Sequence, residues 1–192
     1  MEKVQGNGLR PAIFLDRDGV IIENRANYVR TWKDVVFYEQ ALEALRRLRD
    51  TPYAVVIVTN QSAVGRGILT REQADEINRK VVAHIRSAGG RIDAAYLCPH
   101  APDAGCACRK PHPGMLLQAA KELSLDLTHS WMVGDALTDI QAGQAAGVGH
   151  TVLVRTGRGR AQLPLVQAAV SPPTLIVDNL LAVLSHVSSQ TR

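Results

Sequence analysis

The sequence predicts an α/β fold in which a parallel central sheet lies between two layers of helices. Short runs of consecutive apolar residues, such as 12–15 and 54–58, do not alternate with polar residues, which is typical of strands buried on both faces. Segments with apolar residues at helical spacing separate these runs, and the turns between them are short. Strands and helices that alternate in this way form a parallel sheet covered on both sides.

The first half of the chain contains three predicted strands and two predicted helices. Residues 1–10 are polar and contain glycine, so we expect a tail before a single domain over 11–192. After the strand at 12–15, a polar segment over 19–34 shows no regular period. The next predicted elements are a helix over 39–50 that ends before Pro52, a strand over 54–58, a helix that begins with the capping box Thr70 to Gln73 and runs to about Ser87, and a strand over 93–97.

The second half continues the alternation. Pro113 stands at the start of a predicted helix over 114–123, where proline is tolerated, and Gly147 ends a predicted helix over 138–146. The remaining predicted elements are strands over 131–133, 151–154 and 174–177, a loop over 157–160 and a closing helix over 180–187. No internal repeat, low-complexity segment or linker interrupts this order, so we expect one domain.

Composition and charge are those of an ordinary globular protein. Of 192 residues, 46% are hydrophobic and 21% charged, and the net charge is +4. No apolar run approaches the ~20 residues of a membrane span, and the N-terminus lacks a signal-peptide pattern, so we expect a cytoplasmic protein with no membrane partner. The positive charge suits an anionic substrate, but such a mild excess is usually only a solvated surface. Arg158 and Arg160 have no aromatic neighbour in the sequence, so we expect no nucleic-acid partner.

Polar side chains stand at the ends of three predicted strands. They are Asp16 and Asp18, Thr59 and Asn60, and Asp135 with Asp139. The carboxyl ends of parallel strands meet at one edge of a sheet, and ligands bind there. We therefore expect these side chains to surround one site, although they lie far apart in the sequence.

Asp16 and Asp18 point to a divalent cation. Residues two positions apart on an extended chain point the same way, and two crowded carboxylates need a cation or a proton to offset their charge. Oxygen ligands with room for water suit Mg²⁺. The alternative is an Asx turn that merely ends the strand. The basic pair Arg109 and Lys110 favours the metal, because Mg²⁺ and a lysine together neutralise a phosphoryl group that a free carboxylate can attack. The sequence contains no P-loop motif.

A cysteine-rich segment suggests a second metal. Cys98, His100, Cys106 and Cys108 supply three thiolates and an imidazole within eleven residues, and the odd number of cysteines does not suit a disulfide framework. Three cysteines and one histidine make a closed tetrahedral site for structural zinc. The alternative is three free thiols or a redox sensor.

Together these motifs resemble the haloacid dehalogenase (HAD) superfamily of phosphatases. They occur in the order of that family, as Asp16-Arg17-Asp18-Gly19-Val20, Thr59-Asn60-Gln61, Lys110, and Gly134-Asp135 with Asp139. The resemblance extends from Ile13 to about Val187. It implies a three-layer Rossmann-like HAD fold with no large cap domain and with a zinc-stabilised loop.

The resemblance assigns roles to the acidic residues. Asp16 is implied to be the nucleophile that forms an aspartyl-phosphate and a ligand of Mg²⁺. Asp18 is implied to be the general acid and base, and its backbone carbonyl a further Mg²⁺ ligand. Asp135 completes the metal site, and Asp139 orients water or Lys110 beside it. For Asp139, an N-cap or an exposed helical carboxylate is the alternative.

The resemblance also assigns the phosphate and substrate contacts. Thr59 is implied to hydrogen-bond the phosphoryl oxygens with the Asn60 backbone, and Lys110 to balance the charge of Asp16 and phosphate, which makes Thr59 and Lys110 catalytic. A turn that ends a strand is the alternative for Thr59. The implied substrate contacts are Asn24, Arg25, Ala26, Asn27, Thr59, Asn60, Gln61, Ser62, Arg109 and Lys110.

The cysteine loop resembles one branch of the superfamily, whose members act on heptose bisphosphates or on histidinol phosphate. The segments 59–62, 108–111 and 152–157 favour the heptose enzymes. The resemblance therefore implies a Mg²⁺-dependent monomeric enzyme that removes the 7-phosphate of D-glycero-D-manno-heptose 1,7-bisphosphate during synthesis of surface-glycan precursors. Because a guanidinium can hold a phosphate with two hydrogen bonds, we further expect Arg109 to bind the second phosphate. The alternatives are a histidinol-phosphate phosphatase, a nucleic-acid 3′-phosphatase and a non-catalytic zinc-stabilised binding module.

Overall fold

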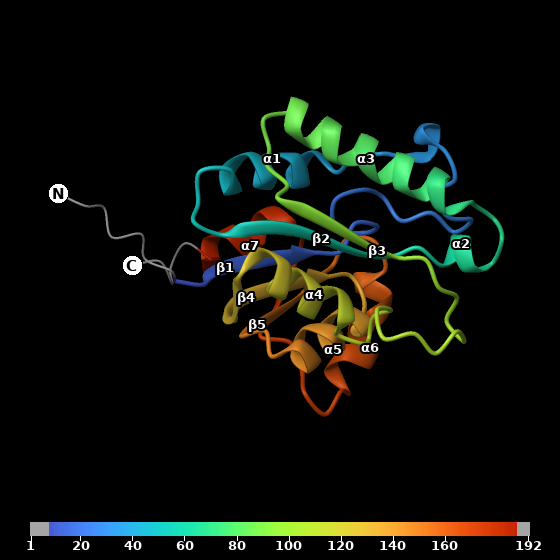
Figure 1. The fold of residues 1–192 in the computed structure, drawn as a ribbon. Coiled ribbons are helices and arrows are strands. Elements are labelled where there is room, and N and C mark those ends of the chain that lie inside the picture. The colour runs from blue at the N-terminus through green and yellow to red at the C-terminus, as the bar shows by residue number, and fades with distance from the viewer. Residues whose placement is uncertain (1–7, 188–192) are drawn as a thin grey trace.

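The fold is built on a six-stranded parallel sheet, seen in a computed structural model that describes residues 8–187 (Figure 1). The strands are β1 (Arg10–Leu15), β2 (Ala54–Asn60), β3 (Ala94–Cys98), β4 (Leu125–Gly134), β5 (His150–Val154) and β6 (Leu175–Val177). They are ordered β3-β2-β1-β4-β5-β6, and all pairs are parallel. The order changes direction at β1, which is where ligands bind in sheets of this type.

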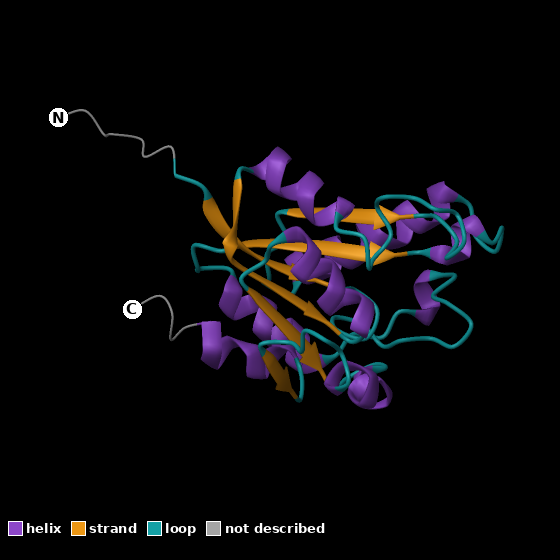
Figure 2. Cartoon of the chain, turned by 90° about the horizontal axis from the view of Figure 1, so that it is seen from below, coloured by secondary structure: helices purple, strands orange, loops and turns teal. Residues whose placement is uncertain are grey.

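Helices cover both faces of the sheet, as Figure 2 shows from a second side. The helices α1 (Glu39–Leu48), α3 (Arg71–Ser87) and α7 (Leu180–Val187) lie on one face, and α4 (Gly114–Leu123), α5 (Leu137–Ala146) and α6 (Gly159–Gln167) lie on the other. A short helix α2 (Ser62–Gly65) and a 3₁₀ turn η1 (Trp32–Asp34) complete the described elements. The predicted three-layer parallel α/β fold is confirmed.

Strand β1 shows why its apolar run does not alternate. Ile13 and Leu15 belong to the core cluster under α1, α3 and α7, whereas Ala12 and Phe14 belong to the cluster under α4 and α5. Each face of the strand is therefore buried, and every position must be apolar.

Most predicted elements are confirmed to within a few residues, including the helices at 114–123 and 180–187. The predicted capping box is present, because Gln73 donates its backbone N–H to Thr70 Oγ1 over 3.2 Å while Thr70 N–H reaches the Gln73 side chain over 2.9 Å. Gly147 ends α5 with a φ of 80°, in the left-handed region that favours glycine.

Three predictions of local structure were wrong. Strand β4 begins at Leu125, six residues before the predicted start, because the polar stretch after Leu125 pairs with the beginning of β1. Residues 157–160 are not a simple loop, since α6 begins at Gly159 and tolerates Pro164 inside it. The predicted tail 1–10 lies outside the described residues as far as residue 7, but Arg10 already belongs to β1. None of the described helices has the length and apolarity to cross a membrane.

Candidate active site

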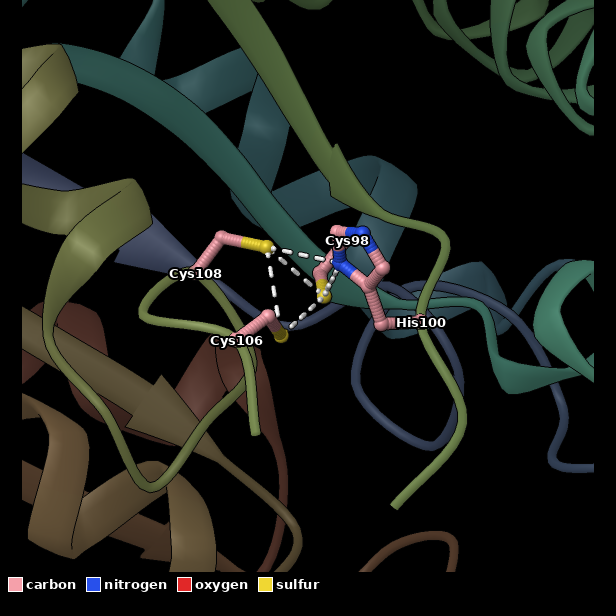
Figure 3. Close-up of side chains that lie close together, drawn as sticks. All are labelled: Cys98, His100, Cys106 and Cys108. Carbon is pink, nitrogen blue, oxygen red and sulfur yellow. Dashed lines mark hydrogen bonds between the residues drawn. The ribbon is translucent and has the colours of Figure 1, made fainter. Parts of the chain in front are cut away.

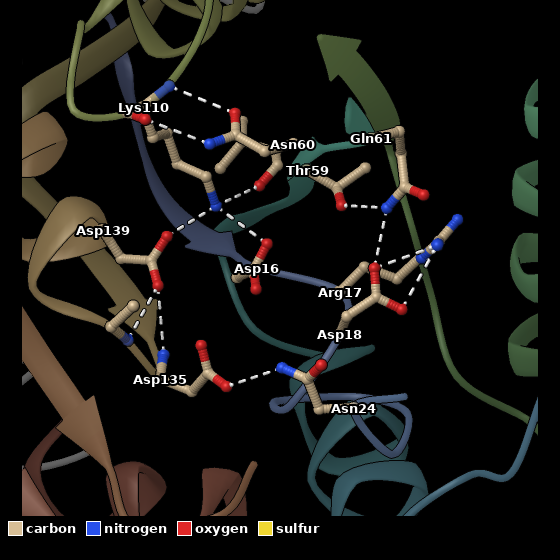
Figure 4. Close-up of polar contacts among 12 residues, drawn as sticks. Asp16, Arg17, Asp18, Asn24, Thr59, Asn60, Gln61, Lys110, Asp135 and Asp139 are labelled. Atoms are coloured by element: carbon tan, nitrogen blue, oxygen red, sulfur yellow. Dashed lines mark hydrogen bonds and ion pairs between the residues drawn. The ribbon is translucent and has the colours of Figure 1, made fainter. Parts of the chain in front are cut away.

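Three buried carboxylates converge at the carboxyl edge of the sheet (Figure 4). Asp16 follows β1, Asp135 follows β4, and Asp139 lies in the first turn of α5; at least one carboxylate oxygen from each lies within 4.8 Å of the others. Burial raises the pKa of Asp135, helped by the charge of Asp16, and burial raises the pKa of Asp139 to about 6. Such a cluster needs a cation or a proton, and its oxygen donors fit Mg²⁺.

Lys110 supplies one positive charge to this cluster. Its Nζ lies 2.8 Å from Asp16 Oδ1 and 2.6 Å from Asp139 Oδ1, and it donates to the carbonyl of Val58 over 2.8 Å. The side chain is 2% exposed. Burial would lower the pKa of Lys110, but the charges of Asp139 and Asp16 outweigh burial and raise it, so the ammonium group stays charged.

The side chain of Asn60 holds Lys110 in place. Asn60 Nδ2 donates to the carbonyl of Lys110 over 3.0 Å, and the Lys110 N–H donates to Asn60 Oδ1 over 3.1 Å. Both backbone groups of Lys110 are thus tied to the end of β2. This contact joins two segments that are 50 residues apart in the sequence.

Asp18 does not join the three converging carboxylates. Its carboxylate accepts hydrogen bonds from Arg17 over 3.0 and 3.2 Å and from Gln61 Nε2 over 2.7 Å. Gln61 Nε2 also donates to Thr59 Oγ1 over 2.9 Å, which links the ends of β1 and β2. Gly19 turns the chain with a φ of 97°, and a Cβ there would lie 2.0 Å from Asp135 Oδ2. The site therefore requires glycine at this position.

A cavity of about 590 Å³ opens over these groups. Of the predicted substrate contacts, eight line the cavity: Asn24, Arg25, Ala26, Asn60, Gln61, Ser62, Arg109 and Lys110. Asn27 and Thr59 do not line it. Asn27 is exposed and accepts a hydrogen bond from Arg30 through its carbonyl, while Thr59 is 1% exposed behind Gln61.

The structure adds Arg158 to the site, a residue that sequence reasoning placed outside it. Its N–H donates to Asp135 Oδ2 over 2.8 Å and its guanidinium to Asp135 Oδ1 over 2.9 Å. Asn24 Nδ2 donates to the same carboxylate over 3.2 Å. The signal that could have found Arg158 is its place after β5, whose carboxyl end lies at the same edge of the sheet as those of β1 and β4.

The four predicted zinc ligands also come together (Figure 3). Cys106 Sγ lies 3.6 Å from the sulfurs of Cys98 and Cys108, which lie 3.0 Å from each other, and His100 Nδ1 lies 3.5 Å from Cys98 Sγ and 3.3 Å from Cys108 Sγ. Sulfurs bound to one tetrahedral zinc at about 2.3 Å are separated by about 3.8 Å. The three thiols form no disulfide, and this donor set fits zinc.

The cysteine loop is attached to the site on both sides. Cys108 is separated from Lys110 by Arg109 alone, whose guanidinium donates to the carbonyl of His100 over 3.2 Å. At the other end, the carbonyl of Cys98 accepts from the N–H of Gln61 over 2.8 Å. The shape of this loop therefore influences both Lys110 and Gln61.

Comparisons with known proteins agree with this geometry. A family model described as HAD-hydrolase-like matches residues 107–183. D-glycero-β-D-manno-heptose-1,7-bisphosphate 7-phosphatase of Photorhabdus laumondii is 42% identical over 177 residues, which are 88% of this chain and 91% of that protein. The enzyme of the same name from Escherichia coli K12 is 37% identical over 189 residues, 95% of this chain and 96% of that protein.

A solved structure shares the fold. The D,D-heptose 1,7-bisphosphate phosphatase of Bordetella bronchiseptica, complexed with magnesium and phosphate, superposes with a TM-score of 0.86 at 36% identity, covering 94% of this chain and 99% of that one. The chain thus belongs to the HAD family of phosphatases. Within that family it is similar to the heptose bisphosphate phosphatases, as its motifs predict.

Proposed function

We propose that this phosphatase removes the 7-phosphate of D-glycero-D-manno-heptose 1,7-bisphosphate, in the synthesis of surface-glycan precursors. The names of its relatives support this substrate, and they cover nearly the whole chain. The observation that carries the chemistry is Lys110 between Asp16 and Asp139 on the floor of an open polar cavity. A buried ammonium beside two carboxylates suits a site that must hold a transferring phosphoryl group.

In this proposal Asp16 attacks phosphorus. Lys110 occupies Oδ1 of Asp16, which leaves Oδ2 to form the new bond. The bond between phosphorus and the sugar oxygen breaks, and the leaving alcohol takes a proton from Asp18. Water then attacks the aspartyl-phosphate, Asp18 accepts its proton, and the phosphate is released from Asp16.

Hydrogen bonds fix the position of Asp18 for this exchange of protons. Gln61 and Arg17 hold its carboxylate at the rim of the cavity, away from Asp135 and Asp139. The hydrogen bonds from Gln61 and Arg17 therefore orient the Asp18 carboxylate, and contacts with the other carboxylates do not. We assign Thr59, with the Asn60 backbone, to the phosphoryl oxygens. Thr59 Oγ1 accepts from Gln61 Nε2, so its hydroxyl proton is available for a phosphoryl oxygen.

Asp16, Asp135 and the Asp18 backbone carbonyl are the proposed ligands of Mg²⁺. The ion supplies neutralisation of the phosphoryl charge when it is bound. Asp139 takes a supporting role in this proposal. It accepts from the N–H groups of Asp135 and Ala136, both over 3.1 Å, and holds Lys110 with its other oxygen.

We further propose that Cys98, His100, Cys106 and Cys108 bind a structural zinc. The segment between the ligands has no apolar core, so the metal would fold it and fix Arg109 and Lys110 beside the cavity. Arg109 then grips the second phosphate of the substrate, for which a guanidinium suits a bidentate contact. A monomeric state and a cytoplasmic location remain predictions.

The direct test is kcat/KM for the heptose bisphosphate and for histidinol phosphate, measured side by side with Mg²⁺. Each transition-state interaction worth about 1.4 kcal/mol gives about tenfold discrimination, so we expect a preference of several orders of magnitude for the heptose substrate. A preference for histidinol phosphate would overturn the proposed substrate and leave the catalytic assignment intact. Activity on neither would overturn the proposed substrate contacts, and a wider panel of phosphate esters would be assayed next.

A further inference from the structure

Arg158 occupies both oxygens of Asp135, a residue that we propose binds Mg²⁺. The backbone N–H lies 2.8 Å from Oδ2, a guanidinium nitrogen lies 2.9 Å from Oδ1, and Nε lies 3.4 Å from Oδ2. Asp135 is fully buried, whereas the Arg158 side chain is 55% exposed. A metal ion that approaches Asp135 from the cavity therefore meets a guanidinium already paired with it.

The backbone around Arg158 is held in place independently of its side chain. Thr156 Oγ1 donates to the carbonyl of Gly19 over 2.6 Å. Gly157 has a φ of 56°, and a Cβ there would lie 2.3 Å from Asp135 Oδ2 and 2.4 Å from Gly19 Cα. The loop after β5 is thus packed against Asp135. The N–H of Arg158 can stay on Oδ2 while the exposed guanidinium leaves Oδ1.

The side chain of Lys110, unlike that of Arg158, is held too tightly to move. It is 2% exposed, and its Nζ has three partners, so it has no room to leave. Arg158 has solvent on one side and the cavity on the other, because it lines the same cavity as Arg109. Of the two described cations that pair with the acidic cluster, Lys110 is therefore fixed and Arg158 can be released.

We propose that Arg158 is a displaceable counter-ion of Asp135. Without Mg²⁺ its guanidinium neutralises the carboxylate; Mg²⁺ displaces it from Oδ1, and the freed guanidinium then becomes a phosphate ligand inside the cavity. This inference rests on the proposed role of Asp135 in Mg²⁺ binding. It adds a residue to the phosphate site and makes that residue available only when the metal is present.

The first test is the affinity for Mg²⁺ without substrate, measured by calorimetry at constant ionic strength. The proteins are the wild type, Arg158→Gln and Arg160→Gln. Arg160 is exposed on the first turn of α6 and does not line the cavity, so its substitution removes the same charge without touching Asp135. We expect Arg158→Gln to bind Mg²⁺ about two- to fivefold more tightly, the range for an ion pair with one exposed partner, and Arg160→Gln to match the wild type.

Each outcome of this test has a separate meaning. A wild type that binds no Mg²⁺ would overturn the proposed metal site itself. A wild type that binds Mg²⁺, with Arg158→Gln no tighter than Arg160→Gln, would overturn the counter-ion role alone. Circular dichroism spectra and melting temperatures of all three proteins show whether they are folded. Arg158→Met, which removes the charge and keeps an unbranched side chain, replaces Arg158→Gln if that variant is unfolded.

The second test is the binding of inorganic phosphate at saturating Mg²⁺. We expect Arg158→Gln to weaken phosphate binding several-fold, Arg158→Lys to weaken it less, and Arg160→Gln to leave it unchanged. Unchanged phosphate affinity in Arg158→Gln would show that the displaced guanidinium does not reach the phosphate. That result would overturn the second half of the inference.

Discussion

Lys110 Nζ lies 2.8 Å from Oδ1 of Asp16, although the two residues are 94 positions apart in the sequence. Both side chains are buried, at 2% and 7% exposure. A buried ion pair gives little net stability, because desolvation offsets most of the attraction, but removing one partner leaves an uncompensated charge. In the proposed mechanism the pair serves the reaction, because it orients the attacking carboxylate and keeps a positive charge where phosphate binds.

Lys110→Met is expected to lower both activity and stability. It leaves Asp16 and Asp139 without their shared cation, and breaking a buried pair costs about 3–5 kcal/mol. Urea denaturation in the absence of Mg²⁺ measures the loss. The control is Lys121→Met, an exposed lysine on α4. If the two variants have equal free energies of unfolding, Lys110 does not compensate the acidic cluster.

Asp16→Asn is expected to abolish turnover while the fold is kept. Asparagine has the same shape but cannot attack phosphorus, and loss of a nucleophile lowers kcat by roughly 10⁴-fold or more. The measurements are kcat and the phosphorylated enzyme trapped by rapid acid quench. Asp50→Asn, at a carboxylate that is 78% exposed, serves as the control. Phosphate release that survives Asp16→Asn would rule out the aspartyl-phosphate mechanism.

The stability of the Mg²⁺-free protein is expected to decrease as the pH rises from about 4 to about 6. The pKa of Asp139 is raised from 3.8 to about 6, and that of Asp135 is raised too, so the folded state binds protons more tightly than the unfolded state. Stability from these protons is fully present below the unfolded pKa and is lost as the pH passes the folded pKa. Asp126, whose pKa is lowered to about 2, acts in the opposite direction at lower pH. So do Glu43, Glu72 and Glu122, whose pKa values are lowered from 4.5, and the slope due to the acidic cluster is therefore measured against Asp139→Asn.

Melting temperatures across this range, with zinc retained and with or without Mg²⁺, test that expectation. Mg²⁺ should stabilise the protein more at pH 7 than at pH 5, because protons compete with it for the carboxylates. Asp139→Asn should flatten the slope in the Mg²⁺-free protein. If the melting temperature changes with pH equally in Asp139→Asn and in the wild type, the pH dependence does not come from the acidic cluster.

Cys106→Ser is expected to release zinc and impair catalysis without unfolding the sheet. Cys106 is half-buried in the loop that leads to Lys110, so loss of the metal should displace Arg109 and Lys110 first. Zinc content per chain, circular dichroism and kcat are the measurements. Ala107→Ser, at an exposed position between two ligands, is the control. Full activity in a zinc-free Cys106→Ser protein would show that the metal does not organise the site.

Arg109→Ala is expected to lower kcat/KM for the bisphosphate and to spare the corresponding 7-monophosphate. A hydrogen bond between charged groups contributes about 1.5–3 kcal/mol, which is about 10- to 150-fold in kcat/KM. Arg79→Ala, on α3 and away from the cavity, is the control. Unchanged discrimination between the two substrates would remove Arg109 from the second-phosphate site.

The sequence by itself determined the layered parallel fold and several positions of the site. An apolar run buried on both faces can be recognised without a structure, because no position along it tolerates a polar residue. The strand ends then place Asp16, Thr59 and Asp135 near one another. The cluster of three cysteines and one histidine could also be recognised from the sequence, because its four side chains lie close together along the chain.

Only the tertiary structure decided which groups touch. Asn60 clamps the backbone of Lys110, Gln61 rather than the acidic cluster holds Asp18, and Arg158 pairs with Asp135. Each of these contacts joins segments that are 23 to 50 residues apart, and each depends on side-chain direction and loop packing to within about an ångström. Residue type and strand order bring such groups to the same edge of the sheet, but they do not select hydrogen-bond partners, because several donors and acceptors compete at that edge and packing chooses among them.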